Sequence, residues 1–263
     1  MKIYLDMDGT LVDFLSQVNK YGFWRKDKEN KVDWKKVKAM GPSFWSEMDW
    51  MPDAEFFFKE LLTYEKDDYF EIYILSSIDF QQGIDGKIQW IKEHTDFPLD
   101  KVIFVTEPED KEQYAASDAF LIDDRKKSLD PFSAAGGNAI EFKGDWNNVK
   151  KQINKSSLLK KKLPILLGWF KEFETFENIG SIKEYLVDEV SYSKSAVIDY
   201  LKRGKRQASC PREIKDPVTN EVLADYFSAY TDEEYYWIDI LPYLIDKYNI
   251  ELPDDFIEKC NRK

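Results

Sequence analysis

Two carboxylates separated by one residue lie near the start of the chain. Asp6 and Asp8 follow an apolar run, and Gly9, which permits a sharp turn of the backbone, comes directly after them. With such a turn, both carboxylates can face one crevice. Crowded carboxylates repel each other unless a cation holds them, and hard oxygen ligands of this kind suit Mg²⁺. The spacing therefore indicates a magnesium site, and the alternative is an ordinary turn after a strand.

Three more polar clusters follow in the sequence. Ser76 and Ser77 end a second apolar run, Lys111 lies twelve residues before Asp123, and Asp123 and Asp124 end another run. Taken singly, paired serines usually form a turn, a lone lysine is usually solvated, and adjacent aspartates usually lie on the surface. Together, the clusters fall near the carboxyl ends of expected parallel strands, the edge at which α/β proteins form their sites. We therefore expect them to converge with the first pair of carboxylates.

The first 150 residues alternate short β-rich runs with longer amphipathic ones. The strand candidates are residues 3–5, 71–75, 102–105, 119–122 and 138–142, and the helical stretches between them are residues 53–64, 81–93 and 146–153. This β-α-β alternation predicts an α/β fold, in which a parallel sheet carries helices on both faces.

A long connection separates the first strand from the next helix that packs on the sheet. It runs from residue 12 to about residue 52 and is rich in aromatic residues. Long insertions in compact domains are usually functional lids. We expect residues 14–52 to form a small, mostly helical cap over the site.

The composition changes after a lysine-rich segment at residues 150–162. This segment reads either as a solvated helix end with a linker or as a phosphate-contacting patch. Beyond it, the pattern predicts a helix over 193–203, a strand over 222–230, and a helix over 231–249 interrupted by Pro242. We therefore expect an α/β domain over 1–155 and a C-terminal α+β accessory module of unknown role over 156–263.

Charge and cysteine content exclude several classes of protein. The 263 residues include 38 basic and 50 acidic side chains, for a net charge of −12. Such a field repels polyanions, so nucleic acid in bulk and anionic membrane surfaces are not expected partners. Two cysteines, Cys210 and Cys260, exclude a disulfide framework and a structural zinc site. The longest apolar run, residues 163–170, is too short to span a membrane, and the apolar part of the N-terminal segment is too short for a signal-peptide core, so we expect a cytoplasmic protein.

The order of these motifs resembles a known family. Asp6-x-Asp8-Gly9-Thr10, then Ser76, Lys111 and Asp123-Asp124, is similar to the four motifs of the haloacid dehalogenase-like phosphatases. The resemblance covers residues 1–150.

Looser patterns place the chain nearest to the 5′(3′)-deoxyribonucleotidases within that superfamily. They are the early position of the cap, the Leu-Ile-Asp-Asp-Arg run at 121–125, the pair Phe44-Trp45 upstream of residues 52–54, and Phe14 at eight residues past Asp6. The sequence of the C-terminal module does not identify a family for it.

The resemblance implies a mechanism for which the residue types are suited. Asp6 would attack phosphorus and form an aspartyl-phosphate. Asp8 would protonate the leaving oxygen and later activate water. Mg²⁺ would be held by Asp6, the backbone carbonyl of Asp8, and Asp123 or Asp124, and would neutralise charge on the phosphoryl oxygens.

The remaining motif residues would bind phosphate. Ser76 and Ser77 would bind its oxygens by hydrogen bonds, and Lys111 would do so as a point charge.

The substrate expected from the resemblance is a (deoxy)nucleoside monophosphate. Phe14, Phe44 and Trp45 could stack on its base, or they could simply form the core of the cap. A close alternative is a phosphatase of another small phosphomonoester. A reading from a different class is a partner-binding or regulatory protein, with a vestigial phosphatase domain and with self-association or a protein partner at 156–263. An intact motif set speaks against that reading, because a vestigial site would be expected to have lost one of the first two carboxylates.

Overall fold

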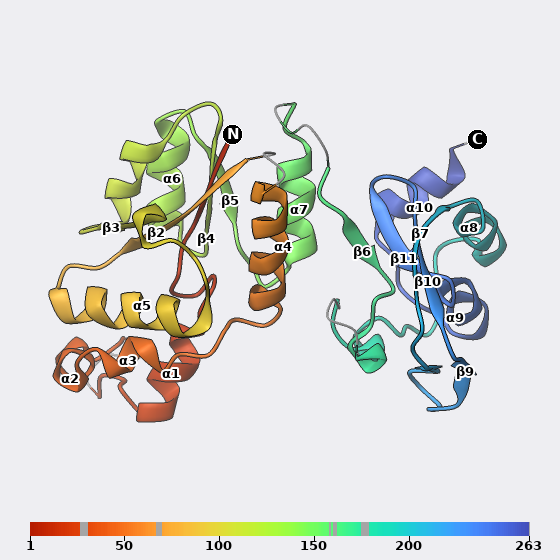
Figure 1. Ribbon diagram of the computed structural model, residues 1–263, viewed down its shortest axis with the longest axis horizontal. Helices are drawn as coiled ribbons and strands as arrows, with labels where there is room; N and C mark the ends of the chain where they lie inside the picture. Colours follow the sequence, from red (N-terminus) through yellow and green to blue (C-terminus); the bar gives the residue numbers. More distant parts are fainter. Residues whose placement is uncertain (27–30, 67–69, 158, 160–161, 175–178, 263) are drawn as a thin grey trace. The chain divides into compact units, whose positions relative to one another are not determined.

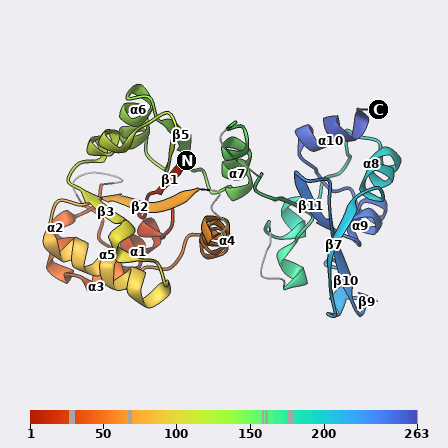
Figure 2. The same cartoon turned by 45° about the horizontal axis from the view of Figure 1, so that its top comes forward.

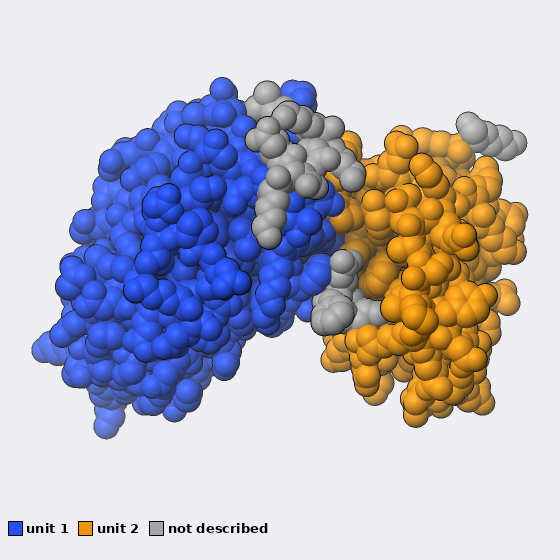
Figure 3. Space-filling model, in the orientation of Figure 1, with its two compact units in different colours: residues 1–161 blue, residues 162–263 orange. Residues whose placement is uncertain are grey.

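The computed structural model describes residues 1–26, 31–66, 70–157, 159, 162–174 and 179–262. The chain divides into two compact units, residues 1–161 and 162–263 (Figure 3). Each unit has its own sheet and its own helices.

Five parallel strands form the sheet of the first unit. They are β1 (Lys2–Leu5), β2 (Glu71–Ser77), β3 (Val102–Val105), β4 (Ala119–Asp123) and β5 (Asn138–Glu141), in the order β3-β2-β1-β4-β5. All five expected strands are present, and the expected α/β class is confirmed. Because β1 is central, with Leu5 opposite both Ile74 and Ile122, the segments that follow β1, β2 and β4 emerge side by side at one edge.

Helices cover both faces of this sheet. Figures 1 and 2 show α6 (Lys126–Ala134) on one face and both α4 (Ala54–Lys66) and α7 (Trp146–Asn154) on the other. Tyr4 and Leu121 pack with Phe132 on the α6 face, while Phe57 stacks on Trp146 at 4.2 Å on the opposite face. The helix α5 (Gln81–His94) connects β2 to β3.

The insertion after β1 is a small helical cap, as expected. It contains α1 (Phe14–Tyr21), α2 (Trp34–Met40) and α3 (Ser43–Ser46). Its two connections to the sheet domain hydrogen-bond to each other: the Asp13 N–H donates to the Asp49 carbonyl at 2.9 Å, and the Met51 N–H donates to the Leu11 carbonyl at 2.8 Å. These hydrogen bonds therefore hold together the two chain segments at the base of the cap, next to the residues that follow β1.

The second unit is an α+β module, also as expected. Its main sheet contains β6 (Ile165–Leu167), β11 (Tyr235–Ile238), β10 (Phe227–Thr231) and β7 (Lys205–Cys210), in that order, and β8 (Ile214–Lys215) pairs with β9 (Val222–Ala224). Among the described residues of this unit, the α-helices are α8 (Lys194–Leu201), α9 (Leu241–Lys247) and α10 (Asp254–Asn261).

Two sequence predictions in this unit are wrong. The helix expected over 231–249 is instead the strand β11 followed by α9, because residues 235–238 are aromatic or β-branched and pair with β10 and β6. Pro242 does not interrupt a helix but lies in the first turn of α9, where its missing N–H leaves no bond unmade. The strand expected over 222–230 is divided into β9 and β10.

The lysine-rich segment is not uniformly solvated. Lys150 is 2% exposed and forms an ion pair with Glu60 of α4. Residues 158, 160 and 161 of that segment lie outside the described residues. Within the part of the chain that the structure describes, no helix is both long enough and apolar enough to cross a membrane.

Candidate active site

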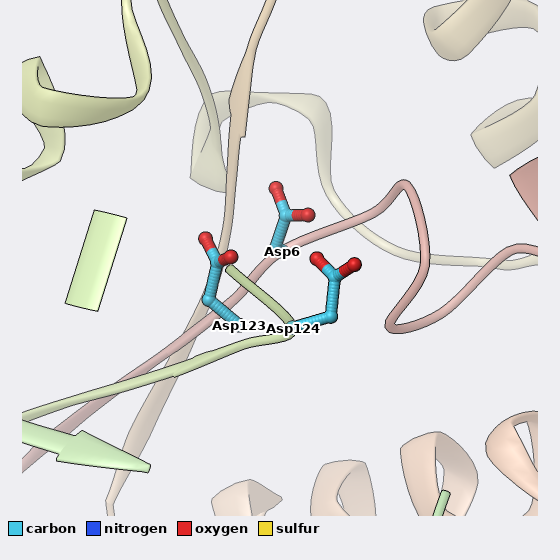
Figure 4. Close-up of side chains that lie close together, drawn as sticks. All are labelled: Asp6, Asp123 and Asp124. Atoms are coloured by element: carbon cyan, nitrogen blue, oxygen red, sulfur yellow. The ribbon is translucent and has the colours of Figure 1, made fainter. Parts of the chain in front are cut away.

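Three carboxylates meet where β1 and β4 end. The Asp6 N–H donates to the Ile122 carbonyl at 3.0 Å, which places the first residue after β1 beside the end of β4. One oxygen from each of Asp6, Asp123 and Asp124 lies within 4.8 Å of the others. Figure 4 shows the three carboxylate groups projecting in the same direction. Asp6 and Asp123 are buried and Asp124 is exposed, so the cluster opens to solvent on the side of Asp124.

A buried lysine bridges two of these carboxylates. Lys111 lies in the 3₁₀ segment η2 (Pro108–Tyr114), between β3 and β4, and is 1% exposed. Its Nζ lies 2.6 Å from Asp6 Oδ1 and 2.6 Å from Asp123 Oδ2. Burial by itself lowers the pKa of Lys111, but the two adjacent carboxylates raise that pKa by more, so the lysine stays cationic.

One cation does not balance three carboxylates. Burial, and then the charge of Asp6, raise the pKa of Asp123, and the same causes raise the pKa of Asp124 to about 7. Both shifts have the direction expected where negative charges are crowded without a further cation. Three hard oxygen donors, one of them solvent-facing, fit a divalent ion such as Mg²⁺, which coordinates few carboxylates and keeps several waters. The expected magnesium site is thus available at this edge of the sheet.

The second carboxylate of the first motif lies on a tight turn. The N–H groups of Thr10, Leu11 and Val12 all donate to the Met7 carbonyl, at 2.8–3.1 Å. Asp8, which lies inside this turn, has two oxygens in different environments. Its Oδ2 accepts a hydrogen bond at 2.8 Å, and its Oδ1 is buried without a partner among the residues that the structure describes.

Asp8 has the electrostatics of a proton donor. Burial is the largest effect on its pKa and raises it, whereas the neighbouring Lys87 opposes that shift. A carboxyl group with a raised pKa keeps its proton up to a higher pH, nearer to neutrality. A general acid must carry a proton before the reaction begins.

Lys87 is a site residue that the motif pattern did not identify. It lies on α5, is fully buried, and donates to Asp8 Oδ2 at 2.8 Å and to Ser76 Oγ at 2.7 Å. A signal for it did exist in the sequence. Residues 83, 86, 87, 90 and 91 recur at the spacing of one helix face, and all five are buried, so a lysine in that series needs a polar partner inside the protein.

The two serines lie at the end of β2, next to this lysine. Ser76 is 1% exposed and accepts the Lys87 hydrogen bond, and Ser77 is partly exposed at the last position of the strand. Through Lys87, the phosphate-binding serine expected from the second motif is joined to Asp8 of the first.

The aromatic residues of the cap are divided between core and surface. Phe44 and Trp45 are 0% and 1% exposed, so neither presents a ring face to a ligand, and their burial favours the reading as cap core. Phe14 is partly exposed, lies 5.7 Å from the Phe44 ring, and contacts the half-exposed Trp34 ring at 5.8 Å. Of the three aromatics expected to contact a substrate, only Phe14 is partly exposed.

Neither a family model nor a curated protein matches the chain. Several solved structures match part of it with low identity. An enzyme of the HAD family from Bacteroides thetaiotaomicron, in complex with magnesium and inorganic phosphate, is 14% identical over 56% of this chain and 98% of its own, with a TM-score of 0.38.

Two further structures match in the same way. A HAD hydrolase from Entamoeba histolytica is 15% identical over 59% of this chain and 90% of its own, with a TM-score of 0.40. The HAD-hydrolase YfnB from Bacillus subtilis, bound to magnesium, is 13% identical over 54% of this chain and 86% of its own, with a TM-score of 0.38. At these TM-scores the likenesses say nothing about activity. The activity is inferred from the side chains of the site.

Proposed function

We propose that residues 1–161 form a Mg²⁺-dependent phosphomonoester hydrolase that works through an aspartyl-phosphate. One observation carries the proposal: a strand-end cluster of three carboxylates is partly neutralised by a buried lysine, and one of the three, Asp6, lies two residues before Asp8, whose buried Oδ1 has no partner among the described residues. This combination provides a nucleophile, an acid, and a place for a divalent cation within one crevice.

In the first half of the reaction, an oxygen of Asp6 attacks phosphorus. A new P–O bond forms to Asp6 and the ester P–O bond breaks, and the leaving oxygen takes its electron pair with it and accepts a proton from Asp8. Lys111 holds Asp6 through Oδ1, which fixes the direction of the nucleophile. The products are an alcohol and the phosphorylated Asp6.

In the second half, water attacks the phosphorus of the aspartyl-phosphate. Asp8, now deprotonated, accepts a proton from the water, and the bond between phosphorus and Asp6 breaks. Inorganic phosphate leaves, Asp6 returns to a carboxylate, and Asp8 again carries a proton. The protein is thus restored with no other reactant than water.

The phosphate needs cationic and hydrogen-bonding partners in both steps. Mg²⁺ held by Asp6, the Asp8 carbonyl and one or both aspartates at the end of β4 would neutralise charge on the phosphoryl oxygens. Ser76, Ser77 and Lys111 supply the protein's own donors. Two serines at the end of β2 are suited to this role because backbone and hydroxyl groups there face the same edge as Asp6.

The substrate class that we propose is the nucleoside monophosphates, with deoxy forms preferred. It rests on the resemblance of the motifs and on the cap that follows β1, whose partly exposed Phe14 offers an aromatic face for a base. Another small phosphomonoester is the alternative, and the same chemistry would serve it.

A panel of phosphomonoesters, assayed with and without Mg²⁺, tests the proposal. The panel should contain 2′-deoxynucleoside and ribonucleoside monophosphates, sugar phosphates and p-nitrophenyl phosphate. We expect Mg²⁺-dependent release of inorganic phosphate, fastest from a deoxynucleoside monophosphate. Equal rates on all esters would remove the nucleotide assignment and leave the phosphatase. No release from any ester, by a folded protein with Mg²⁺, would overturn the phosphatase itself.

A further inference from the structure

Lys87 is fully buried, which is rare for a lysine. Lysines are almost never fully buried unless they are paired, and Lys87 is 0% exposed on a helix whose other inward residues are glycine, tryptophan and isoleucine. Its two hydrogen-bond acceptors come from two separate elements, Asp8 on the loop after β1 and Ser76 on β2. One ammonium therefore joins two residues that the proposed reaction uses.

The backbone at Lys87 is held rigidly against the cap. A Cβ built on the preceding residue, Gly86, would lie 2.2 Å from the Pro42 carbonyl oxygen and 3.0 Å from Trp45 Cβ, so the helix and α3 are in direct contact there. One turn further along, the Trp90 Nε1–H donates to the Met48 carbonyl at 2.8 Å. Lys87 thus extends from a fixed base, as a positioning group must.

An ammonium can only donate hydrogen bonds, and this fixes the direction of both contacts. Ser76 must accept from Lys87, so its single O–H is left to donate elsewhere. Asp8 must accept through Oδ2, so a proton on Asp8 resides on Oδ1, the oxygen without a partner among the described residues.

We propose that Lys87 is a positioning residue: it turns Oδ1 of Asp8 towards the leaving oxygen and frees the Ser76 hydroxyl to bind the phosphoryl group. This inference rests on the proposed phosphatase activity. Lys87 does not touch the reacting atoms itself but acts through Asp8 and Ser76. Its contribution to Asp8 matters only where the leaving oxygen needs a proton.

That dependence gives a test that a merely structural lysine would not pass. p-Nitrophenyl phosphate releases a stabilised phenolate that needs no proton, whereas p-nitrobenzyl phosphate, an ester of similar size, releases an alkoxide that does. The ratio kcat/KM covers the steps up to departure of the leaving group. Comparing kcat/KM for the two esters therefore isolates the contribution of Asp8 as a general acid.

The experiment measures kcat/KM for both esters, with Mg²⁺, on wild type, Lys87→Met, Lys87→Gln, Asp8→Asn and the double variant Asp8→Asn/Lys87→Met. Since general acid catalysis contributes about 10²–10⁴-fold, we expect Lys87→Met to lose at least about tenfold more on the benzyl ester than on the phenyl ester. In the Asp8→Asn background, Lys87→Met should cause no further loss specific to the benzyl ester. Lys92→Met, on the exposed side of the same helix, is the matched control and should behave as wild type.

The possible outcomes are distinct. Equal losses on the two esters in an active protein, or a benzyl-specific loss that persists in the Asp8→Asn background, overturn the role of Lys87 and leave the phosphatase intact. Circular dichroism checks the fold of each variant, and Lys87→Gln, which keeps a polar side chain, serves if Lys87→Met does not fold. Wild-type protein that hydrolyses neither ester overturns the proposed function, and the role of Lys87 with it.

Discussion

The backbone of Gly9 lies directly against the carboxylate of Asp124. A Cβ built on Gly9 would lie 2.6 Å from Asp124 Oδ2, and Gly9 has a φ of +84°, a conformation that side-chain-bearing residues rarely adopt. The glycine after the first motif therefore does two things. It lets the chain turn directly after Asp8, and it leaves room for the Asp124 carboxylate, which comes from the end of β4.

Gly9→Ala should weaken metal binding more than it weakens the fold. The atom that the new methyl group meets is the end of a side chain, so the Asp124 carboxylate moves away instead of the backbone. Alanine at this positive φ strains the folded state and lowers the free energy of unfolding by about 1–2 kcal/mol. We expect isothermal titration calorimetry to show weaker Mg²⁺ binding, with near-wild-type circular dichroism. Unchanged Mg²⁺ affinity would mean that Asp124 does not contribute to the metal site.

Asp6→Asn should abolish turnover and keep the fold. An amide cannot form the aspartyl-phosphate, whereas Lys111 retains Asp123 as a partner for its charge. Phosphate release, measured over hours, should fall by at least about 10³-fold, in keeping with the loss of a nucleophile. Asp130→Asn, an exposed substitution on α6, is the control. Turnover within tenfold of wild type would exclude Asp6 as the nucleophile.

Mg²⁺ affinity should rise with pH around neutrality. In the metal-free protein, burial and the charges of Asp6 and Asp123 raise the pKa of Asp124 to about 7. Below that pH a proton competes with the cation for Asp124, so the apparent affinity increases as pH rises from 6 to 8 and then levels off. Titrations at several pH values test this.

Asp124→Asn provides the matched comparison for the pH effect. It should bind Mg²⁺ more weakly, with a flatter pH profile, because the competing proton is gone. A profile as steep as that of the wild type would assign the titration to another group.

Phe14 and Phe44 should respond differently to the same substitution. Phe44→Leu leaves a cavity in the cap core and should lower the free energy of unfolding by about 1–3 kcal/mol, below the ~3–5 kcal/mol of Phe→Ala. Phe14→Leu removes a partly exposed ring and should leave stability near wild type.

If Phe14 stacks on a base, Phe14→Leu lowers kcat/KM for a deoxynucleoside monophosphate by about fivefold or more, while kcat/KM for p-nitrophenyl phosphate changes little. Equal changes on both substrates would leave the nucleotide assignment resting on resemblance alone.

Asp216 should stabilise the second unit above pH 4 and lose that effect in acid. Burial alone would raise its pKa, but hydrogen bonds from Lys247, from two backbone N–H groups and from Tyr248 lower it to about 2. A pKa depressed from 3.8 contributes about 2 kcal/mol to the free energy of unfolding at neutral pH, lost as pH falls from 4 to 2.

Urea unfolding at pH 7 and at pH 3 tests this contribution. Asp216→Asn should unfold at lower urea than wild type at pH 7, with a smaller difference at pH 3. Asp246→Asn, an exposed substitution on α9, should match wild type at both values. A difference that does not shrink in acid would show that the network acts by packing instead of by charge.

Much of the architecture could be predicted from local patterns. Most strands of the parallel sheet are short runs rich in β-branched and aromatic residues and bounded by turn formers, and such runs can be recognised from the local sequence alone. The parallel order of the sheet then places residues that follow β1 and β4 side by side, so Asp6 and Asp123 could be expected to meet. The helix α6 was not predicted, because Pro131 lies inside it and its apolar residues are few.

The sequence by itself determined the sheet, the cap and the set of carboxylates, because strand periodicity and strand-end residues are properties of short segments. Only the tertiary structure decided whether side chains with partners distant in the sequence are buried or exposed. Lys87 meets Asp8 across 79 residues of sequence, and a lysine on a helix can either reach solvent or pair inside, a choice that depends on what packs above it. The roles of Phe44 and Trp45 were equally ambiguous in the sequence, because an aromatic ring can pack in a core or stack on a ligand. The packing of the cap left them no open face.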